Sequence, residues 1–111
     1  MSALELDKIL KQAQQMQTRM AELQRELAVR RFEGEAGGGM VRAVVSGGLR
    51  VLEIRVEQGI FDSGDHEMLQ DLTAAAVNNA LALAQQSVQQ ELQRVSGGLG
   101  VTVPGASGTT S

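Results

Sequence analysis

The sequence predicts an α+β fold in which two long helices flank a small antiparallel sheet, and three patterns along its 111 residues support this. Apolar residues repeat in heptads through residues 6–27, alternate with other residues through 40–56, and are almost continuous through 72–84. A chain of this length and pattern indicates one domain, which we place at residues 1–98, followed by a flexible tail at 99–111.

The first pattern predicts a long N-terminal helix. No Gly or Pro interrupts residues 3–33, and a helix of about 25 residues is roughly 38 Å long. A compact chain of this size is about 34 Å across, so the helix is expected to extend beyond its own domain and to need a partner. Its apolar heptad positions are Leu6, Ile9, Ala13, Met16, Met20, Leu23 and Leu27.

The second pattern predicts a three-stranded antiparallel meander. A weak first strand is expected around residues 29–35, and the glycine turn at 37–39 leads into a second strand at 40–45. Gly47-Gly48 suits a two-residue hairpin loop before a third strand at 49–56. In that third strand we expect one face to carry Leu52, Ile54 and Val56 and the other face to carry Val51, Glu53 and Arg55.

The third pattern predicts a long second helix. Asp62-Ser63-Gly64-Asp65 is a run of helix-capping residues, and the helix is expected to end near Val95, before Ser96-Gly97-Gly98. The stretch 72–84 is apolar on nearly all sides. Such a helix is buried on more than one side, which one small sheet does not supply.

Composition excludes several classes of function. The absence of Cys rules out disulfides, thiolate zinc sites and cysteine nucleophiles. His66-Glu67 begins like a zinc-protease motif, but Gln70 occupies the place of the second His. No phosphate-binding loop, nucleophile elbow, signal peptide or membrane span is visible. We therefore expect a cytoplasmic protein that is not an enzyme and has no metal, cofactor, membrane or small-molecule substrate.

The distribution of charge is more informative than its total of −3. Nine of the ten basic residues lie in residues 1–55, and no acid occurs between Asp7 and Glu22. That window holds Lys8, Lys11 and Arg19 with several Gln residues, which suits contacts with phosphates. Pairs such as Asp7–Lys11 are also ordinary support for an exposed helix. The residues alone leave both interpretations open, while 2% aromatic content argues against stacking on single-stranded nucleic acid.

Several segments resemble the YbaB/EbfC family of bacterial nucleoid-associated proteins. They are Lys11-Gln12-Ala13-Gln14-Gln15-Met16-Gln17, the glycine turn at 34–41, residues 67–72 with 74–80, and Val103-Pro104-Gly105. The resemblance implies an α-β-β-β-α protomer and an intertwined, tweezer-like homodimer. It also implies binding to double-stranded DNA with modest sequence preference, nucleoid localisation, and an effect on nucleoid organisation and gene expression. Residues 58–64 depart from the family pattern because they lack Lys.

These observations lead to specific expectations for the binding surfaces. The DNA contacts are expected on the first helix and just after it, at Lys8, Lys11, Gln12, Gln15, Arg19, Arg25, Arg30 and Arg31, with Arg42, Arg50 and Arg55 as the substitute site. The dimer interface is expected on the second helix, at Leu72, Ala76, Val77, Ala80, Leu83 and Ala84. The alternative is a coiled-coil or chaperone-like module whose protruding helices grip a protein partner.

Overall fold

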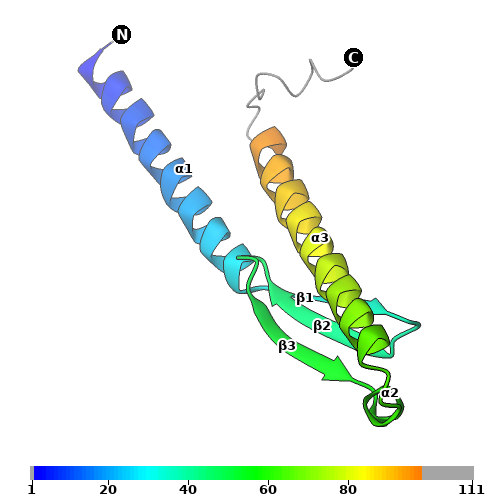
Figure 1. The fold of residues 1–111 in the computed structure, drawn as a ribbon. Helices are drawn as coiled ribbons and strands as arrows, with labels where there is room; N and C mark the ends of the chain where they lie inside the picture. The colour runs from blue at the N-terminus through cyan, green and yellow to red at the C-terminus, as the bar shows by residue number, and fades with distance from the viewer. Residues whose placement is uncertain (1, 99–111) are drawn as a thin grey trace, which may run out of the picture.

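The computed structural model describes residues 2–98, so the predicted tail at 99–111 lies outside the described residues. Two long helices flank a three-stranded sheet, and a short helix precedes the second long one (Figure 1). The elements are α1 (Ala3–Val29), β1 (Arg31–Ala36), β2 (Val41–Ser46), β3 (Val51–Val56), α2 (Gln58–Asp62) and α3 (His66–Gly98). The predicted α-β-β-β-α order is confirmed, and α2 is an additional element.

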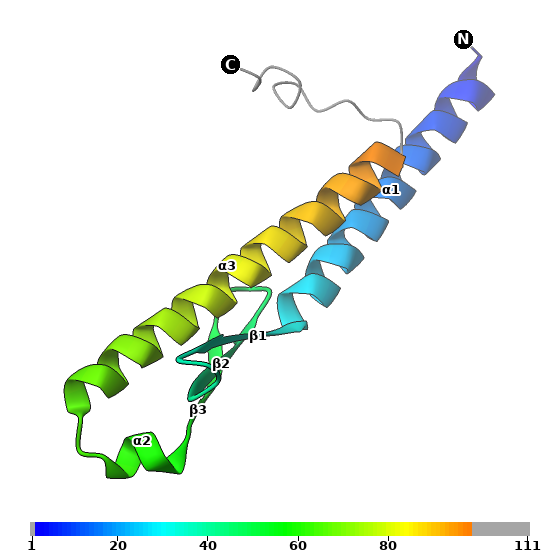
Figure 2. The same ribbon diagram turned by 90° about the vertical axis from the view of Figure 1, so that its right-hand side faces the viewer.

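Helix α1 projects from the rest of the protomer, as predicted. Ser2 and Glu5 form a reciprocal capping box that starts the helix, and Arg30 ends it in an extended conformation. Its 27 residues correspond to about 40 Å. The protomer extends over 74 × 34 × 15 Å with a radius of gyration of 20.8 Å, against about 13 Å for a compact chain of this size. Both α1 and the distal part of α3 run away from the sheet (Figure 2).

The sheet has the order β1-β2-β3 with antiparallel pairing throughout. Two predicted details of β3 are wrong. A bulge opposite Val44 and Val45 makes Val51 the partner of Val45, so Val51 shares a face with Ile54, and Leu52 is the extra residue. The expected two-residue hairpin loop is also longer, since Gly47 to Arg50 connect the strands and Leu49 adopts a left-handed φ of 64°.

Helix α3 lies across β1 and β2 and forms the core with them. Val41, Ala43 and Val45 of β2 are fully buried against the small side chains Ala76, Ala80 and Ala84. A Cβ atom at Gly34 of β1 would lie 2.3 Å from the Ala80 nitrogen, so the absent side chain lets the helix backbone touch the strand.

This packing corrects part of the predicted dimer interface. Ala76, Ala80 and Ala84 have no exposed surface left in the protomer, because they face the sheet of their own chain. They therefore cannot add contact area to a partner without opening this core. Leu72 and Val77 are half-buried and pack against the core, whereas Leu83 is 43% exposed.

The start of α3 follows the predicted capping pattern. The carboxylate of Asp65 accepts a hydrogen bond from the backbone N–H of Met68 at 3.0 Å. The helix extends to Gly98, three residues beyond the expected end near Val95. Within residues 2–98, neither long helix is apolar enough over a sufficient length to cross a membrane.

Candidate nucleic-acid interface

The cationic window of α1 forms one exposed stripe, which we call the outer face. It consists of Lys8, Lys11, Gln12, Gln15 and Arg19. Residues three, four, seven and eleven positions apart share a face of a helix, and all five side chains are exposed. Lys11, Gln15 and Arg19 line one shallow groove along the helix, together with Gln14, Thr18 and Glu22. From Lys8 to Arg19 the stripe spans about 17 Å, or roughly half a turn of B-DNA.

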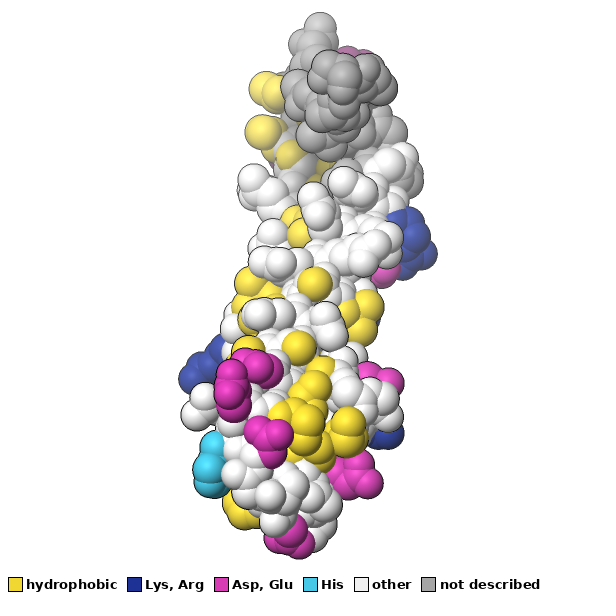
Figure 3. All heavy atoms as spheres, turned by 45° about the vertical axis from the view of Figure 1, so that its right-hand side comes forward, with side chains coloured by type: hydrophobic (Ala, Val, Ile, Leu, Met, Phe, Trp, Pro, Cys, Tyr) yellow, Lys and Arg dark blue, Asp and Glu magenta, His cyan; other side chains and the backbone are white. Residues whose placement is uncertain are grey.

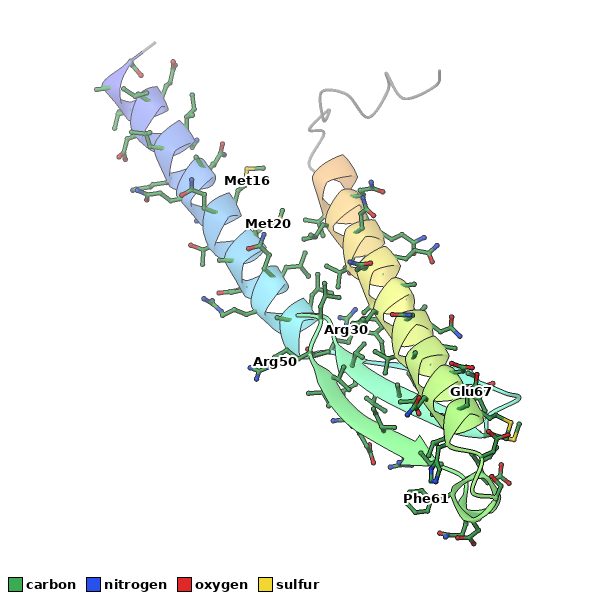
Figure 4. The ribbon with its side chains drawn as sticks, viewed as in Figure 1. Met16, Met20, Arg30, Arg50, Phe61 and Glu67 are labelled. Carbon is green, nitrogen blue, oxygen red and sulfur yellow. The ribbon has the colours of Figure 1, made fainter. Side chains whose placement is uncertain are left out.

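The apolar heptad residues occupy a different side of the same helix. Met16 and Met20 point toward α3 rather than toward the outer face (Figure 4). Exposure decreases along this side, from 49% at Leu6 to 38% at Met16 and 1% at Leu27, where α1 joins the sheet. The helix therefore presents cations and amides on one side and an unpartnered apolar stripe on another.

Ion pairs divide the basic residues into two groups. On the open face of the sheet, Arg31 pairs with Glu53 at 3.4 Å, Arg42 with Glu33 at 3.4 Å, and Arg55 with Glu53 at 2.7 Å. The hydrogen bond from Arg55 to Glu53 also raises the pKa of the Arg55 guanidinium above its usual value. The charge of these arginines is balanced by neighbouring carboxylates.

The cations of α1 and its base are largely free of such partners. Among the described residues, the ion pairs do not include Lys8, Arg19, Arg25, Arg30 or Arg50. Lys11 pairs with Asp7 at 3.4 Å, but both side chains are more than 60% exposed. Exposed pairs of this kind are weak, so a phosphate can replace the carboxylate. The sheet arginines are also exposed, but Arg42 pairs with two carboxylates, and Arg31 and Arg55 pair with Glu53, which is only 35% exposed. Positive charge without a partner is thus concentrated along α1.

The structure separates the predicted supporting arginines. Arg25 lies on α1, whereas Arg30 lies where α1 meets β1. The pKa of Glu91 on α3 is lowered mainly by its hydrogen bond with Arg94, and the charge of Arg30 adds a smaller effect. Arg31 belongs to the sheet and is engaged with Glu53. Arg50, which the sequence placed with the sheet arginines, instead lies in the β2–β3 loop at the base of α1 (Figure 4).

The β2–β3 loop is attached to α1 by backbone hydrogen bonds. The Gly48 N–H donates to the Ala28 carbonyl at 3.1 Å, and the Gly47 N–H donates to the Arg30 carbonyl at 2.9 Å. These bonds place Arg50 near the helix. The sequence held no signal for this contact, because it depends on the way the loop folds back.

The opposite end of the protomer is acidic. Side chains of Asp and Glu gather around α2 and the start of α3 (Figure 3). Glu57, Asp62, Asp65, Glu67 and Asp71 lie in this region, and no Lys or Arg occurs between residues 56 and 93. His66, the single histidine, is exposed here. Within the described residues, no group of three or more His, Asp or Glu side chains is arranged to hold a metal ion.

Comparison with known protein families identifies the family of this chain. Residues 1–99 match the YbaB/EbfC DNA-binding family. The chain belongs to this family. The match covers every element from α1 to α3.

Curated YbaB/EbfC relatives are similar over most of their length. The chain is 43% identical over 99 residues to a nucleoid-associated protein of Syntrophobacter fumaroxidans, covering 86% of this chain and 90% of the relative. It is 45% identical over 91 residues to a nucleoid-associated protein of Chlorobaculum tepidum, covering 82% and 80% respectively.

A solved structure shares the fold of this YbaB/EbfC chain. An uncharacterised protein from Helicobacter pylori superimposes with a TM-score of 0.53 at 17% identity, covering 76% of this chain and 93% of that protein. At this level of identity the likeness concerns the fold alone.

Proposed function

We propose that this chain binds double-stranded DNA as a homodimer and that the outer face of α1 makes the main contacts. The main observation behind this proposal is that cations without ion-pair partners are concentrated on α1 and at its base, whereas the sheet arginines form ion pairs with glutamates. Membership of a DNA-binding family supports the same conclusion. The acidic end around α2 repels phosphates, which directs DNA toward α1.

The residue types on the outer face suit a duplex ligand read with little sequence preference. Lys8, Lys11 and Arg19 can neutralise phosphates, and such contacts carry no sequence information. Gln12 and Gln15 can donate and accept hydrogen bonds at phosphates or base edges. With 2% aromatic residues in the chain, stacking on unpaired bases contributes little.

A dimer would present two outer faces to the duplex. In this proposal the two projecting helices hold DNA between or along them. The relatives are named nucleoid-associated proteins, which supports action at the nucleoid. The proposal extends this action to nucleoid organisation and gene expression. The apolar stripe on α1 and the exposed residues of β3 supply unpartnered surface for self-association.

A matched pair of triple variants tests the DNA site. K8A/K11A/R19A removes three positive charges from the outer face, and R31A/R42A/R55A removes three from the sheet. Because each lost phosphate contact weakens binding several-fold at 0.1 M salt, the helix variant should bind a random duplex at least tenfold more weakly. The sheet variant should stay within about threefold of the native chain. Equal weakening would mean that net charge alone determines binding.

The reverse outcome, with only the sheet variant impaired, would move the site to the sheet arginines. Circular dichroism and light scattering on each variant confirm that the fold and the oligomeric state are retained. A mobility-shift titration at fixed salt gives the dissociation constants.

A second candidate function is supported by the exposed apolar stripe of α1. Leu6, Ile9 and Met16 are between 38% and 49% exposed, which would suit a helical protein partner. Pull-down from lysate with and without nuclease separates this function from DNA binding. Partners that survive nuclease treatment would favour it, whereas loss of all partners would favour DNA binding.

A further inference from the structure

Charged side chains cover the open face of the sheet, which points away from α3. Alternation along the strands places three arginines and three glutamates on this face. The arginines are Arg31, Arg42 and Arg55, and the glutamates, which we call the sheet glutamates, are Glu33, Glu35 and Glu53. Most of these side chains line one shallow depression together with Phe32 and Val44. The face carries no net charge, although it holds three guanidinium groups.

Glu53 of β3 pairs with two of the arginines. Its carboxylate lies 3.4 Å from the guanidinium of Arg31, which belongs to β1, and 2.7 Å from the guanidinium of Arg55 on its own strand. Among the described residues, neither arginine forms an ion pair with any other carboxylate. Loss of this one negative charge would therefore leave both arginines without a partner.

Arg42 of β2 has the opposite arrangement, because two carboxylates pair with one guanidinium. Glu33 lies 3.4 Å away and Glu35 lies 3.9 Å away, both on β1. Loss of either glutamate would leave Arg42 with the other as a partner. Glu53 alone thus neutralises two arginines, whereas Glu33 alone neutralises none.

The sheet glutamates hinder the approach of a phosphate to this face. The arginines themselves are accessible, since the side chains of Arg31, Arg42 and Arg55 are between 52% and 71% exposed. A carboxylate that a phosphate displaces from an arginine stays attached to the same sheet, where neighbouring strands are about 4.8 Å apart. It therefore repels the phosphate at close range. On α1, by contrast, no acid occurs between Asp7 and Glu22.

We propose that the sheet glutamates determine where duplex DNA binds, because they suppress a second phosphate-binding face formed by Arg31, Arg42 and Arg55. This proposal rests on the proposed function and adds the residues that exclude DNA from the sheet. Without the glutamate charges, three guanidinium groups would lie within about 10 Å across the strands, and guanidinium groups bind phosphates strongly. Exposed ion pairs contribute little to stability, so the main effect of the glutamates is on surface charge.

Neutralising the sheet glutamates in a chain whose outer face is disabled tests this proposal directly. The parent is K8A/K11A/R19A, and E33Q/E35Q/E53Q is added to it. The added substitutions should strengthen binding of a random duplex at least about tenfold. The salt slope should approach about −5, the value for six phosphate contacts in a dimer. Further addition of R31A/R42A/R55A should abolish the gain.

The matched control removes the same number of negative charges from the acidic end. E57Q/E67Q/D71N changes residues in a region with no Lys or Arg between residues 56 and 93. In the same parent it should strengthen binding by no more than about threefold and leave the salt slope nearly unchanged. Equal gains from the two sets would show that total charge is responsible and would overturn the proposal. Absence of a gain from E33Q/E35Q/E53Q would also overturn it.

Two single substitutions on the same face give a finer test. E53Q leaves two arginines without a partner and should strengthen binding of the parent about threefold. E33Q leaves Arg42 paired with Glu35 and should change binding less than about twofold. The reverse order would contradict the proposal. Glutamine has nearly the size of glutamate, and thermal melts of each variant confirm that the fold is retained.

Failure of this proposal is distinguishable from failure of the proposed function. If K8A/K11A/R19A binds the duplex as tightly as the native chain, the outer face is not the DNA site and the proposed function fails. The gain from E33Q/E35Q/E53Q is measured relative to that parent, so it reports separately on the sheet glutamates.

Discussion

Replacement of Gly34 by Ala should severely destabilise the protomer. The added Cβ would lie 2.3 Å from the Ala80 nitrogen and 2.7 Å from the Ala76 carbonyl oxygen. Both are backbone atoms of α3, so no side chain can rotate away, and the helix must move by about 1 Å to reach ordinary contact. That shift separates Ala76 and Ala80 from β2, where they form the core. Overpacking of this type costs about 3 kcal/mol.

The expected loss is a large fraction of the stability of a domain this size. With about 4 to 8 °C of melting temperature per kcal/mol, G34A should melt roughly 12 to 24 °C below the native chain. Thermal melts followed by circular dichroism at equal protein concentration measure the difference. The matched control is G59A, because a Cβ at Gly59 meets no atom within 4 Å. A G34A protein that melts with the native chain would refute the packing of α3 on β1.

Two further predictions concern the loop after β2 and the distal part of α3. L49G should melt at a slightly higher temperature than L49A, because only glycine adopts the left-handed φ of 64° at that position without strain. Relief of this strain stabilises the folded chain by about 1 kcal/mol. Equal melting temperatures of the two variants would show that the position is unstrained. The hydrogen bond from Arg94 lowers the pKa of Glu91 below its ordinary value of 4.5. Because the folded-state pKa is lowered, the ionised Glu91 stabilises the folded chain above pH 4.5, and this stabilisation is lost as the pH falls. The difference in free energy of unfolding between the native chain and E91Q should therefore shrink from pH 6 to pH 3. A gap that stays constant in urea titrations over that range would contradict this.

The sequence predicted those features that depend on local periodicity. The uninterrupted helical pattern of α1, the alternation of Val41, Ala43 and Val45, and the cap at Asp65 are each properties of a single element. The outer face of α1 was also predictable, because an acid-free window at helical spacing needs no tertiary information. The family resemblance is confirmed by the match over residues 1–99.

The features that the sequence did not predict depend on contacts between distant elements. An apolar stretch at 72–84 indicated burial, but not that Ala76, Ala80 and Ala84 face their own sheet rather than a partner. The bulge at Leu52 reverses the side on which Val51 lies, and nothing in the alternation marks it. The ion pairs that neutralise Arg31 and Arg42 join different strands, so they became visible only with the register of the sheet.

The salt dependence of duplex binding tests most directly whether the outer face of α1 binds phosphates. Three cations in each protomer correspond to about six phosphate contacts for a dimer, so the logarithm of the association constant should fall with the logarithm of salt concentration at a slope of about −5. K8A/K11A/R19A should make the slope much shallower and lower the affinity, leaving only the contribution of cations such as Arg25 and Arg30. A slope near zero for the native chain, or an unchanged slope in the variant, would show that the outer face does not bind DNA.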